Sequence, residues 1–157
     1  MKLKSVVLRN FRCYQSETRI QIGNLTALIG KNDVGKSTIL EALEIYFNNL
    51  AVKIDPQDAC IHSGSKEITI GCEFEDLPDG LVLDETATTT LKDEYLLNER
   101  GCLEIHKVFD CGTSKVKESV FALAHHPRDE LLVLKNAELK KRFEGLKVDK
   151  SEAGVNL

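Results

Sequence analysis

The sequence lacks the features of several specialised classes of protein. No apolar run approaches the roughly 20 residues that a membrane-spanning helix needs, and no signal-peptide core follows the N-terminus. The five cysteines include no C-x-x-C pair, so we expect reduced thiols rather than a zinc site. The net charge of −4 excludes a chain that is basic throughout, although local basic patches stay open. These absences favour a soluble, cytoplasmic protein.

The 157 residues suit a single domain with a sizeable core, and they contain no internal repeat. Apolar residues alternate with polar ones in several short stretches, which predicts strands. One long stretch has apolar residues at helical spacing, followed much later by a weaker one. We predict strands at about 4–11, 18–22, 25–29, 68–75, 103–109 and 116–124, and helices at about 35–47 and 128–144.

The segment "GKNDVGKS" fits the phosphate-binding pattern G-x-x-x-x-G-K-[ST]. Gly30 and Gly35 allow backbone angles that turn successive N–H groups toward phosphate oxygens. Lys36 is placed to reach the β- and γ-phosphates, and the Ser37 hydroxyl to bind Mg²⁺. An apolar stretch before the loop and an amphipathic helix after it supply the expected context. The segment therefore predicts binding of ATP with Mg²⁺.

Hydrolysis also needs an acidic residue at the end of a buried strand. The sequence "LVLDE" offers Asp84 and Glu85, but only three apolar residues precede Asp84, which is short for a central strand. An exposed turn explains this stretch better. We therefore assign no catalytic residue in this chain.

The N-terminal stretch "LKSVVLRNFRCYQSETRIQIGNLTALIGKNDVGKSTILEALEIYF" resembles the head segment of the SMC/RecF-type ABC ATPases. Asn10-Phe11-Arg12 closes the first strand, Asn32 lies within the loop, and Leu40-Glu41-Ala42-Leu43 follows it. The segment Asp58 to Gly64, with the strand "EITIGCEF", resembles the OLD-family ATP-dependent endonucleases. The specific resemblance covers about residues 3–74.

This resemblance implies an α/β P-loop NTPase of ABC type, with a mixed sheet and an antiparallel β-region at about 67–124. It implies that the chain (1–157) is the N-terminal lobe of a longer ATPase head. The signature motif, the Walker B acid and a Toprim nuclease domain would lie elsewhere, and the segment alone would be inactive. Arg12 is the basic residue expected to approach the nucleotide. The residues that would hold ATP are Gly30, Lys31, Asn32, Asp33, Val34, Gly35, Lys36, Ser37, Thr38 and Arg12, with Ser37 also on Mg²⁺.

In such families two heads sandwich ATP, so the resemblance implies a second copy of the head, DNA as target, and ATP-gated cleavage by the nuclease. A role in bacterial defence against phage, with further protein or nucleic-acid components, is implied in the same way. Two alternatives stay open: a regulatory module that binds ATP without cleaving it, and a small self-contained NTPase that uses Asp84 and Glu85.

The remaining polar residues fit structural or solvent-exposed positions better than functional sites. We interpret His125-His126 as a polar strand end, and His62 and His106 as isolated side chains. The resemblance also implies a residue that couples metal to water between the first helix and the next strand, where Gln57, Asp58 and His62 are equally placed. We predict a solvated, acidic strand face and turn from Glu73, Glu75, Asp76 and Asp79, and a solvated helix face from Lys135, Lys140, Lys141 and Arg142.

Overall fold

The computed structural model describes residues 1–31, 35–48, 51–82, 88–124 and 134–145. These residues belong to two compact units, Met1–His125 and His126–Leu157, and each is described by itself. The first unit contains the sheet and the phosphate loop. The second contains one described helix, α2 (Asn136–Gly145).

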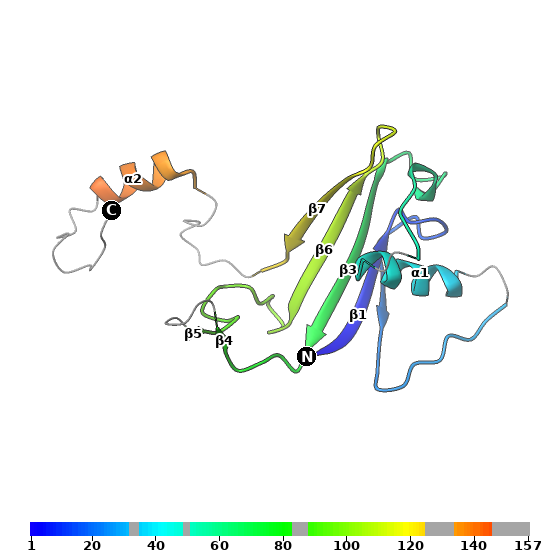
Figure 1. Cartoon of the computed structure of the whole chain (residues 1–157), viewed down its shortest axis with the longest axis horizontal. Coiled ribbons are helices and arrows are strands. Elements are labelled where there is room, and N and C mark those ends of the chain that lie inside the picture. The colour runs from blue at the N-terminus through cyan, green and yellow to red at the C-terminus, as the bar shows by residue number, and fades with distance from the viewer. Residues whose placement is uncertain (32–34, 49–50, 83–87, 125–133, 146–157) are drawn as a thin grey trace. The chain divides into compact units, whose positions relative to one another are not determined.

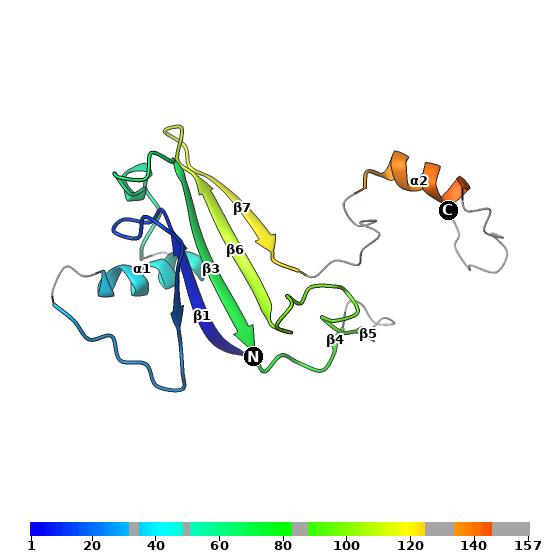
Figure 2. The same cartoon turned by 180° about the vertical axis from the view of Figure 1, so that it is seen from behind.

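A five-stranded sheet forms the centre of the first unit (Figure 1 and Figure 2). Its strand order is β2-β1-β3-β6-β7, and every neighbouring pair is antiparallel. The expected strands of these regions are thereby confirmed, and the antiparallel β-region is present. The strands are β1 (Lys2–Arg9), β2 (Thr18–Gln21), β3 (Glu67–Glu75), β6 (Leu103–Asp110) and β7 (Lys117–Ala122).

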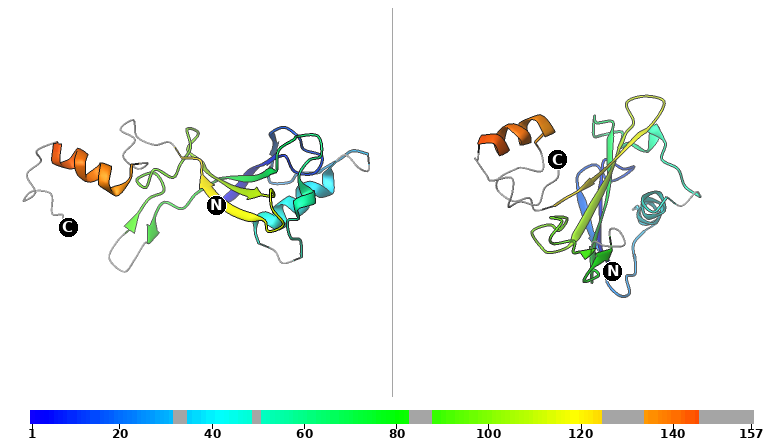
Figure 3. Two further views of the ribbon diagram at one scale, coloured as in Figure 1. Left: turned by 90° about the horizontal axis from the view of Figure 1, so that it is seen from above. Right: turned by 60° about the vertical axis from the view of Figure 1, so that its left-hand side comes forward.

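One face of the sheet packs against helix α1 (Lys36–Tyr46), which is seen end-on beside the sheet in the right-hand view of Figure 3. The alternation in β3 causes this, because every second residue of a strand points to the same face. The apolar members of β3 and of α1 belong to one buried cluster. That cluster consists of Val6, Leu8, Phe11, Ile39, Ala42, Ile45, Tyr46, Ala59, Ile68, Ile70, Cys72, Phe74, Phe109 and Cys111.

The predicted helix at about 35–47 is confirmed as α1. Gly35 is its N-cap and has a left-handed backbone with φ of 84°, which glycine adopts without steric cost. Phe47 is the C-cap. The helix therefore starts directly at the second glycine of the phosphate-loop pattern.

The predicted strand at 25–29 is wrong for the described structure. This stretch pairs with no described strand, and Leu25 and Ile29 are 94% and 93% exposed. Only Leu28 packs against the buried cluster. A strand needs a hydrogen-bonded neighbour, and no described strand pairs with this stretch, although β2 forms an edge of the sheet. The described sheet is therefore antiparallel rather than mixed.

The other elements are short. A 3₁₀ turn, η1 (Pro56–Asp58), lies between α1 and β3, and β4 (Leu81–Val82) pairs with β5 (Thr88–Thr89) in a separate small sheet. No helix forms in the described residues 88–98. The helix predicted at 128–144 is confirmed from Asn136 onward as α2, whereas residues 134 and 135 are described and not helical; the Lys135 carbonyl accepts the first helical hydrogen bonds. The remainder of that prediction, residues 128–133, lies outside the described residues.

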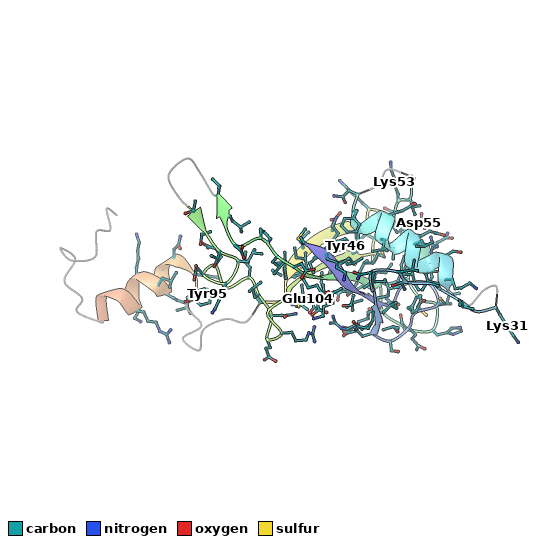
Figure 4. The ribbon with its side chains drawn as sticks, turned by 90° about the horizontal axis from the view of Figure 1, so that it is seen from below. Lys31, Tyr46, Lys53, Asp55, Tyr95 and Glu104 are labelled. Atoms are coloured by element: carbon teal, nitrogen blue, oxygen red, sulfur yellow. The ribbon has the colours of Figure 1, made fainter. Side chains whose placement is uncertain are left out.

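The face of the sheet opposite α1 carries a buried ionic cluster, which corrects the prediction of a fully solvated acidic face. Glu73 and Glu104 face each other across β3 and β6 and are only 1% and 2% exposed. Arg19 pairs with both carboxylates, at 3.0 and 2.6 Å, and Arg100 pairs with both at 2.8 and 2.9 Å. We call these four residues the ionic cluster; Glu104 is labelled in Figure 4.

Neutral donors complete the ionic cluster. Asn98 donates to both carboxylates, and Ser5 donates to Glu73 at 2.9 Å. Burial opposes ionisation of Glu73, but the hydrogen bonds from Ser5, Arg100 and Asn98 outweigh it and lower its pKa to about 2. Burial likewise opposes ionisation of Glu104, but its hydrogen bonds, first that from Arg19, outweigh burial and lower its pKa. Both glutamates are therefore charged at neutral pH, and hydrogen bonds connect the loop around Asn98 to the sheet.

The imidazole of His106 is also part of this face rather than isolated. Its Nε2 lies 3.0 Å from Oε1 of Glu104, and its ring lies over Gly71 of the neighbouring strand. A Cβ at Gly71 would approach the ring to 2.4 Å, so only glycine leaves the imidazole this position. The prediction of solvent exposure does hold for Asp76 and Asp79.

Candidate functional site

The phosphate loop (residues 30–38) includes the N-terminus of α1, where Gly35 is the N-cap. The ammonium group of Lys36 folds back and donates to the carbonyl of Gly30, at 2.8 Å, and to that of Lys31. Lys31 lies at the outer end of the segment before α1, where Figure 4 labels it. The Ser37 side chain is exposed, whereas Thr38 is buried. A cation and a hydroxyl group thus flank the helix N-terminus, where anions are stabilised.

Part of the expected site is not described. Asn32, Asp33 and Val34 lie outside the described residues, as do Asp84, Glu85, His125 and His126. The two residues before Asp84 that are described, Leu81 and Val82, belong to the small β4–β5 sheet.

A tight turn at the end of β1 packs directly on the phosphate loop. Phe11 and Tyr14 exchange backbone hydrogen bonds of 3.1 and 2.9 Å, which close the turn. The Tyr14 hydroxyl donates to the carbonyl oxygen of Gly35 at 3.2 Å. A Cβ at Gly35 would lie 2.6 Å from Sγ of Cys13 and 3.2 Å from the Tyr14 ring. Gly35 is therefore required by this contact as well as by its positive φ.

Arg12 projects from the same turn toward two carboxylates. Its Nε donates to Oδ1 of Asp58 at 2.8 Å, and its Nη1 donates to Oε2 of Glu41. Its backbone N–H also donates to the carbonyl of Asp58, at 2.6 Å. Partial burial opposes the charge on Arg12, but the hydrogen bonds to Asp58 and Glu41 outweigh it and raise its pKa.

Asn10 holds the base of this turn. Its amide nitrogen donates to the carbonyls of Ser65 and Glu67, at 3.0 and 2.8 Å. Its side-chain oxygen accepts from the Cys60 N–H at 3.0 Å and from the Ser63 hydroxyl. All these bonds come from a residue that is 2% exposed and has a φ of 54°. The sequence "NFR" thus joins the end of β1 to the segment before β3.

Three partners in this site were not predicted: Tyr14, Glu41 as a partner of Arg12, and Asp58 as its second partner. The sequence predicted Glu41 only as part of the Leu40-Glu41-Ala42-Leu43 motif that follows the loop. Its position four residues after Ser37, one helical turn onward, was the available signal. Of the three candidates for a metal-coupling residue, Asp58 is engaged by Arg12, while Gln57 and His62 are exposed.

No group of three or more His, Cys, Asp or Glu side chains among the described residues could hold a metal ion. Nor is any helix in the described ranges long and apolar enough to cross a membrane.

Comparisons with known proteins agree with a nucleotide-binding domain. Arcadin-4 of Pyrobaculum calidifontis is 30% identical over 104 residues, which are 64% of this chain and 12% of that protein. The OLD nuclease of Thermus scotoductus is 31% identical over 77 residues, which are 46% of this chain and 14% of that protein. The chain thus spans only a small part of the length of these curated relatives. The expected similarity to the OLD family is confirmed by the second relative.

Among solved structures, the SMC head domain from Thermotoga maritima aligns over 82% of this chain and 40% of its own, with a TM-score of 0.46 and 15% identity. A family model described as an AAA ATPase domain matches residues 1–153, and so covers nearly the whole chain. The chain is an α/β P-loop NTPase that belongs to the AAA ATPase domain family.

Proposed function

We propose that this chain is the ATP-binding N-terminal lobe of an OLD-like ATPase head. The observation that carries the proposal is the start of α1, where a left-handed glycine cap precedes Lys36 and the Lys36 ammonium turns toward the loop. In the proposed complex Gly30 to Thr38 surround the phosphates and Ser37 binds Mg²⁺. Magnesium ligation by a hydroxyl leaves the remaining positions for phosphate oxygens and water.

A second part of the proposal concerns the apolar stretch Leu25 to Ile29. Its exposed side chains fit a strand that gains its neighbours from a second lobe of the same head. The acidic residue and the signature motif needed for hydrolysis would come with that lobe. The small share of each curated relative that this chain spans supports a longer protein.

In the full-length gene product we propose that two heads clamp ATP between them and gate a nuclease that acts on DNA, as part of a defence against phage. The similarity to an OLD nuclease supports this reading.

The proposal is tested on the full-length gene product. We expect DNA cleavage that requires ATP and Mg²⁺, and association of two heads that increases with a non-hydrolysable ATP analogue. Lys36→Ala is expected to abolish both responses, whereas Lys53→Ala, an exposed lysine outside the site, should leave them unchanged. Cleavage at the same rate without nucleotide would contradict the proposal.

The regulatory module stays the alternative function, because Asp84 and Glu85, the acids considered for hydrolysis, lie outside the described residues. The same experiment separates the two functions. ATP-dependent association without any DNA cleavage or ATP turnover in the full-length product would favour the regulatory module.

A further inference from the structure

We propose that Arg12 is a positioning residue, which supports the ATP site through Glu41 of α1 and does not itself contact the nucleotide. This inference rests on the proposed ATP binding. It departs from the expectation that Arg12 approaches the nucleotide directly. We call Arg12, Glu41 and Asp58 the arginine clasp.

The charges within the clasp favour a supporting role. Two of the donor groups of the guanidinium are directed at the carboxylates of Glu41 and Asp58. One positive and two negative formal charges leave the clasp net negative, so it offers no attraction to a phosphate. Both carboxylates are also partly withdrawn from water, with 36% and 14% of their side chains exposed.

The geometry indicates that the arginine clasp helps to position α1 at the phosphate loop. The turn that carries Arg12 holds α1 at two points: Tyr14 binds the carbonyl of Gly35, and Arg12 binds Glu41. These points are six residues apart along the helix, or about 9 Å. Two attachments at that separation fix both the rotation and the depth of the first turns of α1, and therefore the N–H groups that face phosphate.

The backbone of the turn supports the same conclusion. Asn10 and Arg12 both have left-handed φ values, 54° and 50°. Non-glycine residues keep such angles only where surrounding contacts determine them. Here Asn10 is held by four hydrogen bonds, and Arg12 by the clasp and the Asp58 carbonyl. Asp58 is itself fixed by its carboxylate, which accepts from the N–H of Asp55 at 2.8 Å.

Glu41→Gln distinguishes a clasp from direct contact by the direction of its effect. If Arg12 contacts phosphate, removing a competing negative charge should leave ATP affinity unchanged or increase it. If Arg12 acts through Glu41, the same change should weaken ATP binding. The test is displacement of a fluorescent ATP analogue from the full-length gene product, together with the kcat and KM of its ATPase activity.

The clasp predicts that Glu41→Gln and Arg12→Ala each weaken ATP binding roughly five- to twentyfold, which is the range for one charged hydrogen bond. The double variant should be weakened no further than about twofold beyond the stronger single variant. KM should rise in all three, with kcat within about twofold of wild type. Arg12→Lys, which keeps one charge but cannot fork to two carboxylates, should fall between wild type and Arg12→Ala.

Glu44→Gln is the matched control, because Glu44 lies on the same helix and makes no hydrogen bond or ion pair with the described residues. It should bind ATP as wild type does. Wild-type or tighter affinity in Glu41→Gln, or additive losses in the double variant, would overturn the clasp but not the proposed function. So would a loss of thermal stability with unchanged Kd. A folded wild type without affinity for ATP would overturn both.

Discussion

The two faces of the central sheet are built from the same strands but by opposite chemistry. On the α1 face, apolar side chains interlock with the helix that begins at the phosphate loop. On the opposite face, the ionic cluster joins two buried carboxylates to two arginines, one from the edge strand β2 and one from the loop before β6.

The two faces of the sheet therefore stabilise different parts of the fold. The apolar face holds α1 with non-directional contacts, whose strength depends on the area buried. The ionic cluster instead fixes the positions of particular segments, because each of its hydrogen bonds requires a defined geometry. We therefore expect changes on the α1 face to affect both stability and nucleotide binding, and changes in the ionic cluster to affect stability alone.

The largest expected effect is on the α1 face. Ile70→Ala removes a fully buried side chain from the cluster beneath the helix. We expect a loss of about 2–4 kcal/mol in unfolding free energy, from lost burial and the cavity left behind. Denaturant unfolding measures it. The ATP affinity of the variant that remains folded should also fall. An unchanged Kd would show that the packing of α1 on the sheet does not affect ATP binding at the phosphate loop.

A somewhat smaller loss is expected from the ionic cluster. Glu104→Gln removes the charge that faces Arg19, Arg100 and His106, and it leaves the partly buried guanidinium of Arg19 with one charged partner fewer. We expect a loss of about 2–3 kcal/mol. The ATP affinity of the folded variant should match that of wild type. A large change in Kd would contradict the separation of the two faces.

The pH dependence of stability sharpens the same point. The pKa of Glu73 is lowered to about 2 from an ordinary value of 4.5, so its contribution is fully present above pH 4.5. The contribution is lost as the pH falls from 4.5 toward 2, because the unfolded chain binds the proton first. Unfolding free energies from pH 7 to pH 3 should therefore fall less steeply in Glu73→Gln than in wild type. Equal slopes would contradict a charged, hydrogen-bonded Glu73.

The smallest expected effect comes from Tyr14→Phe. This change removes only the hydroxyl that donates to the Gly35 carbonyl and keeps the ring that packs beside it. We expect ATP binding to weaken about two- to fivefold, since a neutral hydrogen bond contributes roughly 0.5–1.5 kcal/mol. A loss of tenfold or more would show that the hydroxyl has a second role at the loop.

Periodic segments were predictable because their signals are local. The alternation in β3 and the apolar stripe of α1 each determine a buried face without reference to the rest of the chain. The phosphate-loop pattern likewise placed Lys36 at a helix N-terminus. The stretch 25–29 failed because an apolar run identifies a strand only if a neighbouring strand is present to pair with it.

The long-range polar contacts were not predictable. Glu73 has the same alternating pattern whether it faces water or Arg19 and Arg100, which lie far from it in the sequence. Arg12 was recognised through a family motif, yet its partner Glu41 belongs to another element. Such pairs form only in the folded arrangement, so the local periodicity of the sequence does not predict them.

The central proposal is that this chain binds ATP and that the groups that hydrolyse ATP lie outside this segment. The most direct test measures ATP binding and ATP turnover by the 157-residue chain alone, next to Lys36→Ala and Asp84→Asn. We predict binding that Lys36→Ala abolishes, with no turnover above background in any of the three. Turnover by the isolated chain that disappears in Asp84→Asn would contradict the claim and identify a self-contained NTPase.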